Sequence, residues 1–372
     1  MKVALVLTQD RAGPVDLTVA LALEIAGRSD GPEVVIVGPE PVTSAGDASG
    51  LLRPITVQSK LDVGGALRLR RMLAEIGPDV VHAQDRRAGL MAAGIARGTA
   101  PVLGTYHGIP DAMVTPDLAP GHDAAGVRPG PRAAAVLAAD AGLLRLLPVT
   151  VAPSEFVADF VRRRLYAPRD RVRVVLNGVA QGAAATPQGP ARIFTSVNAF
   201  APRKAMTRLV EAFATVARRR SEVRLRLIGD GEERSVCERL VIEHGLESSV
   251  EFLGYRTDVP AQLTEADAFV LPSLAENMPL ALLEAMSAGL ACVATRVGGV
   301  PEALASGAGL LVPPGDTGAL AEAMTRLADE PGLAETLGAT ALARARASFS
   351  IARCADEHVA LWGELAGDAA GR

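Results

Sequence analysis

Short apolar runs rich in β-branched residues alternate with longer Ala- and Leu-rich segments along the chain. In the first half, six such runs predict strands buried on both faces, at residues 2–7, 33–38, 79–83, 101–107, 148–152 and 172–176. Helical periodicity lies between them, for example at residues 14–27, 65–76 and 154–165. This alternation is typical of βαβ units and predicts a parallel sheet covered by helices.

The same alternation restarts after residues 177–191, which are rich in Gly, Ala, Pro and Gln and have no apolar period. We interpret this segment as an interdomain linker. Beyond it, strands are predicted at residues 192–197, 223–229, 250–255, 268–272, 291–295 and 309–313. Helices are predicted to follow at residues 316–328 and 334–366.

The two halves predict an α/β protein with two Rossmann-like, doubly wound parallel-sheet domains. A chain of 372 residues is long for a single core, which favours two domains. We expect one domain at residues 1–180 and one at 191–349, with a C-terminal helix at about 350–368 packing back on the first. Because ligands bind at the carboxyl ends of such strands, the two switch points are expected to face a common cleft.

Composition excludes several classes of protein. The 38 basic and 42 acidic residues nearly balance, which gives no electrostatic reason to expect a nucleic-acid partner. The three cysteines lack the spacing of a disulfide framework or a thiolate metal site. The N-terminal apolar run reaches charge at Asp10, too soon for a signal peptide, and no later run approaches the roughly 20 apolar residues of a membrane span. We therefore expect a cytoplasmic protein without a transmembrane segment.

Two glutamates frame a predicted strand-loop-helix junction. Glu276 follows the strand at 268–272, and Glu284 lies eight positions later inside the next helix. Pro279 suits the first turn of that helix, and Gly289 suits its C-terminal cap. The amides at a helix N-terminus favour an anion or a hydroxyl-rich ligand. Taken singly, each carboxylate also fits a solvated surface position.

Residues 272–302, PSLAENMPLALLEAMSAGLACVATRVGGVPE, resemble the E-x7-E signature of the retaining GT-B glycosyltransferases of the family 4, group 1 type. Further segments follow that family's order at about its spacing: DVVHA, GTYHG, VAPSEFVADFV, VVLNGV, PRKAMTRLVEAF, LIGDGEER and FLGY. The resemblance implies a GT-B fold. It also implies transfer of a sugar from a nucleoside-diphosphate sugar to an acceptor hydroxyl, with retention of configuration.

The resemblance also implies how the donor is held. Glu284 would accept hydrogen bonds from the ribose hydroxyls, and Glu276 would hold a hydroxyl of the transferred sugar. A carboxylate suits a vicinal diol because its two oxygens accept several hydrogen bonds. The intervening residues would contribute backbone contacts to the donor; they are Asn277, Met278, Pro279 and Leu280.

Arg203 and Lys204 stand where the family keeps a basic pair for the diphosphate. Positive charge is needed there because donor cleavage leaves an anionic nucleoside diphosphate. The plainer alternative is a solvated charge pair at a helix start. A further arginine that the family often carries is replaced here by Asn198 or Ala199. Backbone contacts to the nucleotide are implied for Gly229, Tyr255 and Arg256.

The first domain would supply the acceptor side. His107 matches a family histidine near the reacting sugar and would be a hydroxyl partner, although a lone histidine after a strand is often structural. Gly13 matches the family's glycine loop near the diphosphate, with Ala12 in place of a second glycine. Asp111 and Asp117 lie in the long Gly- and Pro-rich loop 108–132, and we expect them to contact the acceptor.

The expected catalytic residues are therefore His107, Arg203, Lys204 and Glu276. The family resemblance implies front-face substitution, in which the departing phosphate helps to deprotonate the acceptor. No Asp-x-Asp pair is present, so we expect activity with no metal and no cofactor, the nucleotide sugar being a co-substrate.

The sequence leaves the acceptor and its setting open. The acidic loop favours a small soluble acceptor, such as a specialised metabolite or a cationic cyclitol, whereas basic runs at residues 68–71 and 162–171 leave peripheral membrane contact possible. Two alternatives are a nucleotide-sugar epimerase or hydrolase of the same two-lobed architecture, and a non-catalytic sugar-nucleotide-binding protein. A nicotinamide dehydrogenase is disfavoured because no complete G-x-G-x-x-G follows the first strand. Oligomeric state has no signature in the sequence.

Overall fold

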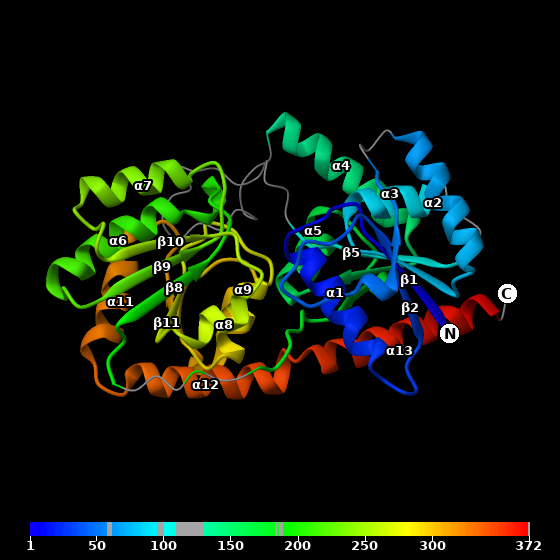
Figure 1. Cartoon of the computed structure of the whole chain (residues 1–372). Helices are drawn as coiled ribbons and strands as arrows, with labels where there is room; N and C mark the ends of the chain where they lie inside the picture. The colour runs from blue at the N-terminus through cyan, green and yellow to red at the C-terminus, as the bar shows by residue number, and fades with distance from the viewer. Residues whose placement is uncertain (58–61, 95–99, 109–129, 183–184, 186–188, 371–372) are drawn as a thin grey trace. The chain divides into compact units, whose positions relative to one another are not determined.

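The structure is a computed structural model that describes residues 1–57, 62–94, 100–108, 130–182, 185 and 189–370. The chain divides into two compact units, each described here by itself. The first unit contains Met1–Gly108, Pro131–Ala180 and the C-terminal helix from Ser350 onwards, and the second contains Gln181–Phe349. Each unit is a parallel sheet covered by helices (Figure 1).

The first unit is built on a seven-stranded parallel sheet with the order β3-β2-β1-β4-β5-β6-β7. Its central strands are buried on both faces, which explains their unbroken apolar runs. The strands are β1 Lys2–Val6, β2 Glu33–Gly38, β3 Leu52–Pro54, β4 Val80–Ala83, β5 Val102–Thr105, β6 Val149–Ala152 and β7 Val172–Val174.

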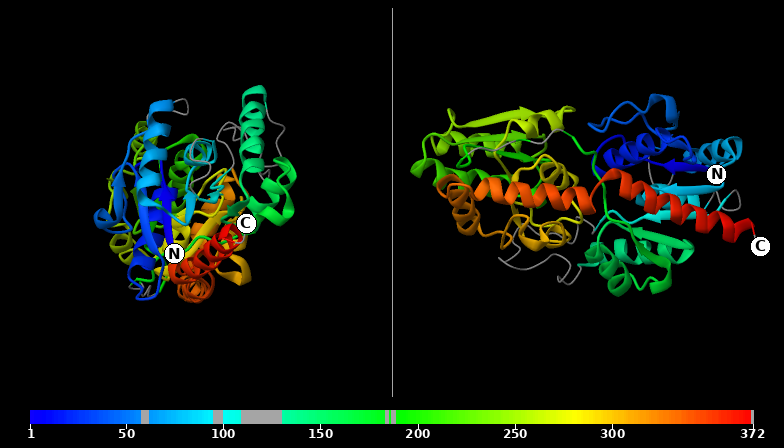
Figure 2. Two further views of the ribbon diagram at one scale, coloured as in Figure 1. Left: turned by 90° about the vertical axis from the view of Figure 1, so that its right-hand side faces the viewer. Right: turned by 90° about the horizontal axis from the view of Figure 1, so that it is seen from below.

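Helices of the first unit connect these strands. They are α1 Gly13–Ala26, α2 Val63–Ile76, α3 Arg86–Gly94, α4 Pro131–Leu146, α5 Glu155–Arg164 and α13 Ile351–Ala370. The last of these helices returns to the start of the chain and packs along α1 and against β4 (Figure 2). Arg28 of the first unit donates a 2.6 Å hydrogen bond to Asp356 of α13.

The second unit is built on a six-stranded parallel sheet with the order β10-β9-β8-β11-β12-β13. Its strands are β8 Ile193–Val197, β9 Arg224–Ile228, β10 Val250–Gly254, β11 Ala268–Leu271, β12 Ala291–Thr295 and β13 Leu310–Val312. Its helices are α6 Met206–Arg219, α7 Arg234–Glu243, α8 Val259–Thr264, α9 Leu280–Ser287, α10 Val300–Ala303, α11 Thr317–Asp329 and α12 Leu333–Ser348. Apolar side chains of α6 and α11 pack on the sheet in one buried cluster.

Two predictions about elements are wrong, and one strand was missed. The single helix expected at 334–366 is interrupted at Phe349 and Ser350, where α12 ends and α13 begins. The break is stabilised locally, because the Ser350 side-chain oxygen accepts a hydrogen bond from the Arg353 amide at 3.3 Å, and Ser350 pairs with Val179 in a short parallel bridge. The edge strand β3 was not predicted at all. Helix α4 begins at Pro131, inside the segment that was expected to be a loop.

Both sheets reverse their strand order once. The first unit reverses between β1 and β4, and the second between β8 and β11. In an open parallel sheet, the loops at the carboxyl ends of two such strands diverge to opposite faces and leave a crevice in which ligands bind. The segments after these four strands are therefore the places to search for a site.

Candidate functional site

In the second unit, the two loops at the switch point are joined by an ion pair. Lys204 ends a short 3-10 turn, Pro202–Lys204, after β8, and its ammonium group contacts Glu276 Oε1 from the loop after β11. The side chains are only 12% and 6% exposed, so solvent screens the pair weakly. The backbone of the two loops is joined as well, because the Leu274 amide donates to the Arg203 carbonyl at 2.8 Å.

Glu276 is held by more than its lysine partner. The Ser273 hydroxyl donates to Glu276 Oε1 at 2.7 Å, and Ser273 is itself fixed because its carbonyl accepts from the Thr295 hydroxyl at 2.5 Å. Burial alone raises the pKa of Glu276, but the positive charges of Lys204 and Arg203 outweigh that effect, and the pKa lies below its usual value. The carboxylate is therefore ionised at neutral pH.

The loop after β12 presses against the backbone of Glu276. Gly298 has a φ of +54°, and a Cβ atom there would lie 1.7 Å from the Glu276 carbonyl oxygen. The neighbouring Gly299 amide donates to the Asn277 carbonyl at 2.7 Å. Ser273, Gly298 and Gly299 were not among the predicted site residues. A pair of adjacent glycines after a buried strand was the one available signal for this close approach.

Residues 277–280 lead directly from Glu276 into α9. Pro279 is the residue before the helix and has an extended backbone, with φ −72° and ψ 120°. Its carbonyl accepts the first α-helical hydrogen bond, from the Leu283 amide at 3.3 Å. Met278 is buried, whereas Glu284 lies partly exposed on α9, one turn beyond Leu280. The two glutamates thus occupy one short strand-loop-helix segment, as the sequence predicted.

Gly229 makes the approach between the loops after β8 and β9 possible. Its φ is +126°, and a Cβ atom there would lie 1.9 Å from the Asn198 carbonyl oxygen. The Gly229 amide donates to the Gly254 carbonyl at 2.8 Å, which ties the end of β9 to the end of β10. Any side chain at Gly229 would push these loops apart.

Tyr255 and Arg256 follow β10 at the same edge of the sheet. Tyr255 is 50% exposed. The Arg256 guanidinium donates hydrogen bonds of 2.7 Å and 2.5 Å to the Asp258 carboxylate. The second unit therefore gathers the predicted residues Arg203, Lys204, Gly229, Tyr255, Arg256, Glu276 to Leu280 and Glu284 at the carboxyl ends of four adjacent strands.

In the first unit, His107 lies just beyond β5 and is partly buried. Its Nε2 is 3.4 Å from Gln84 Oε1, at the end of β4. Burial, with a smaller contribution from His358, lowers the pKa of His107 to about 4. The preceding Tyr106 donates to Asp140 at 2.8 Å. His107 is thus a neutral imidazole in a packed polar environment.

Gly13 is the first residue of α1, at the carboxyl end of β1. The preceding Ala12 has φ 90° and ψ 167°, a conformation that is normally reserved for glycine. The loop therefore keeps a glycine-like path although one of the two glycines expected from the family is an alanine. Near this switch point, Asp85 after β4 joins Thr8 after β1. The Asp85 carboxylate accepts hydrogen bonds from the Thr8 amide and hydroxyl at 2.6 and 2.7 Å.

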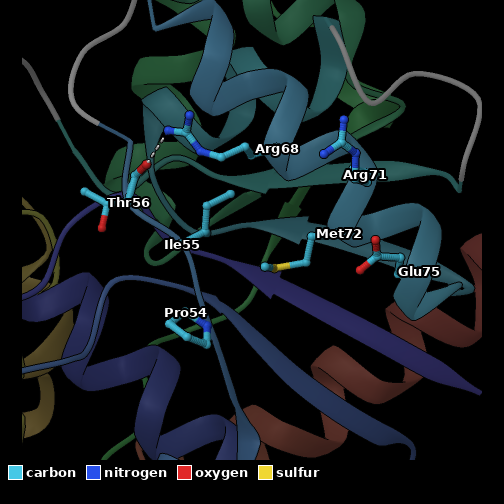
Figure 3. A pocket seen from close by; sticks show the side chains of 7 residues that line it. All are labelled: Pro54, Ile55, Thr56, Arg68, Arg71, Met72 and Glu75. Atoms are coloured by element: carbon cyan, nitrogen blue, oxygen red, sulfur yellow. Dashed lines mark hydrogen bonds between the residues drawn. The ribbon is translucent and has the colours of Figure 1, made fainter.

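Other predicted or visible features lie elsewhere. Asp111 and Asp117 fall outside the described residues. Figure 3 shows a hollow in the first unit that none of the predicted site residues lines; its walls are Pro54, Ile55, Thr56, Arg68, Arg71, Met72 and Glu75. Within the described ranges, no three His, Cys, Asp or Glu side chains are grouped closely enough to hold a metal ion. Of the helices that the structure describes, none has the length and apolar character needed to cross a membrane.

Comparison with known families matches both halves of the chain. Residues 18–181 match the family described as Glycosyltransferase Family 4, and residues 191–330 match Glycosyl transferases group 1. The chain is 30% identical over 305 residues to the lipopolysaccharide core biosynthesis glycosyltransferase LpsD of Rhizobium meliloti, an alignment that covers 79% of this chain and 78% of that protein.

Two further relatives match over shorter regions. The chain is 32% identical over 184 residues to N-acetyl-alpha-D-glucosaminyl L-malate synthase of Bacillus anthracis, covering 49% of this chain and 46% of that protein. It is 30% identical over 172 residues to alpha-D-kanosaminyltransferase of Streptomyces kanamyceticus, covering 45% of each. The chain thus spans about half the length of these two curated relatives.

Solved structures resemble the whole chain. The Anabaena protein Alr3699/HepE in complex with UDP and glucose superposes with a TM-score of 0.79 at 18% identity, covering 98% of this chain and 100% of that one. Sucrose-phosphate synthase from Thermosynechococcus elongatus gives a TM-score of 0.76 at 22% identity, covering 98% of each chain. At such identities the likeness establishes the fold alone.

Proposed function

The chain belongs to the group 1 glycosyltransferases of the GT-B fold, and from that premise we propose that it moves a sugar from a nucleoside-diphosphate sugar to an acceptor hydroxyl with retention of configuration. In this proposal residues 191–349 bind the nucleotide sugar, and residues 1–180 bind the acceptor. The observation that carries the proposal is the buried Lys204–Glu276 pair at the switch point of the second sheet. Such a position is where open parallel sheets bind ligands.

The two charges of the pair have complementary uses with this donor. Cleavage of the anomeric bond leaves a nucleoside diphosphate, and the ammonium of Lys204 with the guanidinium of Arg203 would stabilise its growing negative charge. Glu276 is kept ionised by the same cations, so that its second oxygen accepts a hydrogen bond from a sugar hydroxyl. The start of α9 directly after Glu276 adds a favourable dipole for an anionic donor. Glu284 on the same helix would accept from the ribose hydroxyls.

Retention admits two mechanisms that use these residues differently. A carboxylate nucleophile would form a covalent glycosyl-enzyme intermediate. Glu276 is poorly suited to that role because one of its oxygens already binds both Lys204 and Ser273. We therefore favour front-face substitution, in which the bond to the leaving phosphate breaks as the acceptor oxygen approaches, and the phosphate takes the acceptor proton.

A small soluble acceptor is the version of the proposal that we prefer. It is supported by the Bacillus anthracis relative, which is named an N-acetyl-alpha-D-glucosaminyl L-malate synthase, and by the three aspartates in the sequence of residues 108–132. Other relatives carry names that place them in the synthesis of lipopolysaccharide core or of glycans on diphosphoundecaprenol. Small polyols, hydroxy acids and aminocyclitols should thus be compared with lipid-linked sugars.

The proposal is tested by incubating the protein with UDP-, GDP-, ADP- and dTDP-sugars and each acceptor, and by following release of the nucleoside diphosphate. Structural neighbours have been solved in complex with UDP and glucose or with UDP-glucose, so UDP-sugars come first. Proton NMR of the product should show the anomeric configuration of the donor, and an inverted product would contradict retention. Turnover without acceptor would instead indicate an epimerase or hydrolase, and binding without any turnover would indicate a binding protein. Activity is expected to persist in EDTA.

A further inference from the structure

A chain of buried hydrogen bonds leads from the C-terminal helix to His107 in the first unit. Trp362 of α13 donates from its indole Nε1 to His82 Nδ1 at 3.3 Å. Gln84 Nε2 contacts the same His82 nitrogen at 3.2 Å, and Gln84 Oε1 contacts His107 Nε2 at 3.4 Å. His82, Gln84 and Trp362 are at most 1% exposed. Nothing in the proposed transfer reaction requires these three residues to be polar.

The chemistry of the donors fixes the tautomer of His82. An indole N–H can only donate, so His82 Nδ1 must be the acceptor. His82 is neutral, because burial together with the nearby His358 and His107 holds its pKa well below the usual value. Its proton is therefore on Nε2, which donates to the Thr105 hydroxyl at 2.8 Å.

The orientation of Gln84 follows from that tautomer. Because His82 Nδ1 accepts, the amide group of Gln84 turns its NH₂ toward His82 and its oxygen toward His107. An amide oxygen can only accept, so His107 Nε2 must carry the proton of that contact. In the neutral ring of His107 the lone pair is then on Nδ1.

We propose that Gln84, oriented by Trp362 through His82, is a positioning residue that holds His107 in the Nε2–H tautomer, so that His107 Nδ1 accepts a hydrogen bond from a substrate hydroxyl. The inference rests on the proposed sugar transfer, since it gives the role of His107 in that reaction. It assigns to the C-terminal helix a part in the site as well as in packing. The connection from Trp362 to His107 could not be predicted from residue spacing, because Trp362 lies 280 positions from His82 in the sequence.

A second set of contacts keeps the backbone at His107 in place. The preceding Tyr106 donates its hydroxyl hydrogen to Asp140 Oδ2 at 2.8 Å, and the Arg86 guanidinium donates to the Tyr106 oxygen at 3.0 Å. Arg86 also donates to the Gly108 carbonyl. The backbone is therefore fixed independently of Gln84, which leaves the tautomer and tilt of the imidazole as the properties that Gln84 controls.

The tautomer is measured directly by NMR of protein labelled with ¹⁵N in its histidine rings, with His107 assigned by its loss in His107→Gln. We expect a pyrrole-type Nε2 and a pyridine-type Nδ1 at His107 in the wild type. Gln84→Met, similar in shape but with neither donor nor acceptor, should give a mixture of tautomers. A wild-type His107 protonated on Nδ1, or an unchanged tautomer in Gln84→Met, would overturn the proposal.

Steady-state kinetics distinguish a role of Gln84 in positioning His107 from a general loss of stability. Gln84→Met should lower kcat about tenfold or more with the donor KM little changed, whereas His107→Gln should lower it further. Trp362→Phe removes one of the two donors to His82 and should have an intermediate effect. Ser154→Ala removes the cap of α5, a 3.2 Å bond to the Val157 amide, and serves as a matched loss of one buried hydrogen bond that leaves kcat unchanged.

The two kinds of failure are distinguishable. If no pair of donor and acceptor supports turnover, the proposed function is wrong. The NMR measurement of the His107 tautomer needs no substrate and still tests the contact with Gln84. If sugar transfer occurs but Gln84→Met retains both wild-type kcat and the wild-type tautomer, the positioning role is wrong and the transferase proposal survives. Loss of kcat in Gln84→Met with an unchanged His107 tautomer would likewise contradict the inference.

Discussion

Lys204 and Glu276 stabilise each other where neither charge is favourable alone. Removing one partner of a buried pair leaves an uncompensated charge, which typically costs about 3 to 5 kcal/mol. Lys204→Met and Glu276→Gln should therefore each lower the free energy of unfolding, and the double variant should lose less than the sum of the two. Urea denaturation of all four proteins measures this coupling.

A surface pair provides the comparison. Arg220 contacts Asp329 at 2.5 Å, but these side chains are 42% and 37% exposed. Arg220→Met is expected to leave the urea midpoint unchanged, because solvent screens an exposed pair and its members lose side-chain entropy in forming it. Strictly additive losses in the Lys204 and Glu276 series, equal to those of independent sites, would contradict a buried ion pair.

Ala12 carries a conformation that only glycine adopts without strain. Residues held at such backbone angles cost about 1 to 3 kcal/mol. Ala12→Gly should therefore raise the free energy of unfolding by about 1 kcal/mol, despite the larger entropy of glycine in the unfolded chain. The control is Ala74→Gly on the exposed face of α2, which should lower stability by about 1 kcal/mol. Thermal unfolding of both variants checks the opposite signs; a destabilised Ala12→Gly would mean that the loop follows a different path.

At the scale of elements, the loop after β12 sets the position of the Glu276 loop. Gly298→Ala adds a methyl group 1.7 Å from the Glu276 carbonyl oxygen, so the loop must move. Gly307→Ala is the matched control, because Gly307 has a φ of +77° but no atom within 4 Å of the added Cβ. Both variants should lower the free energy of unfolding by a similar amount, about 1 kcal/mol, because alanine is strained at a positive φ.

Only Gly298→Ala should also weaken binding of the nucleotide sugar, by about tenfold or more, because it moves the loop that we propose to hold the sugar hydroxyl. Titration calorimetry with the donor identified in the screen measures this difference. Equal donor affinity in Gly298→Ala and Gly307→Ala would show that the loop after β12 does not support the donor site.

The sequence predicted those elements whose signal is local. Most strands were found because they are short, mainly apolar runs rich in β-branched residues. Strand β3 was missed because its three residues include Arg53 and Pro54 and it lies at the sheet edge. The break at Phe349 was missed because the Ala-rich helical pattern continues through it without Gly or Pro, leaving Ser348 and Ser350 as the only cap signals.

The sequence placed the candidate residues near one switch point of the second sheet, but it did not predict their contacts with one another. Spacing placed Glu276 and Glu284 on one strand-loop-helix segment and Lys204 at the start of another. Their pairing depends on the adjacency of β8 and β11, which are 72 positions apart at the contact. The polar chain behind His107 depends in the same way on a contact between distant segments: a C-terminal helix was expected to pack back on the first domain, but residue spacing did not specify that Trp362 would meet His82.

At the scale of the whole molecule, buried histidines make stability depend on pH. Burial lowers the pKa of His358 to about 4, that of His107 is also lowered to about 4, and that of His82 lies well below its usual value. The unfolded chain therefore binds protons first as the pH falls. Stability should be full above pH 6.5 and decline between pH 6.5 and pH 4.

The decline is measurable as urea midpoints at pH 7.5, 6.5, 5.5 and 4.5. His358 alone should contribute about 2 kcal/mol of loss between pH 6.5 and 5, at about 1.4 kcal/mol for each unit of pKa difference. His244 lies on the surface, so His244→Asn should keep the whole dependence. Trp362, the single tryptophan, gives the fluorescence signal for these experiments. A stability that is flat from pH 6.5 to 5 would contradict neutral histidines in the core.

The central claim is that the Lys204–Glu276 site binds an activated sugar. The most direct measurement is titration calorimetry of UDP-, GDP-, ADP- and dTDP-sugars into the wild type, Lys204→Met and Glu284→Ala. We expect one nucleotide to bind at one site per chain, with affinity reduced by about tenfold or more in both variants while their folds persist. Binding of none of the four donors, or equal affinity in all three proteins, would contradict the account.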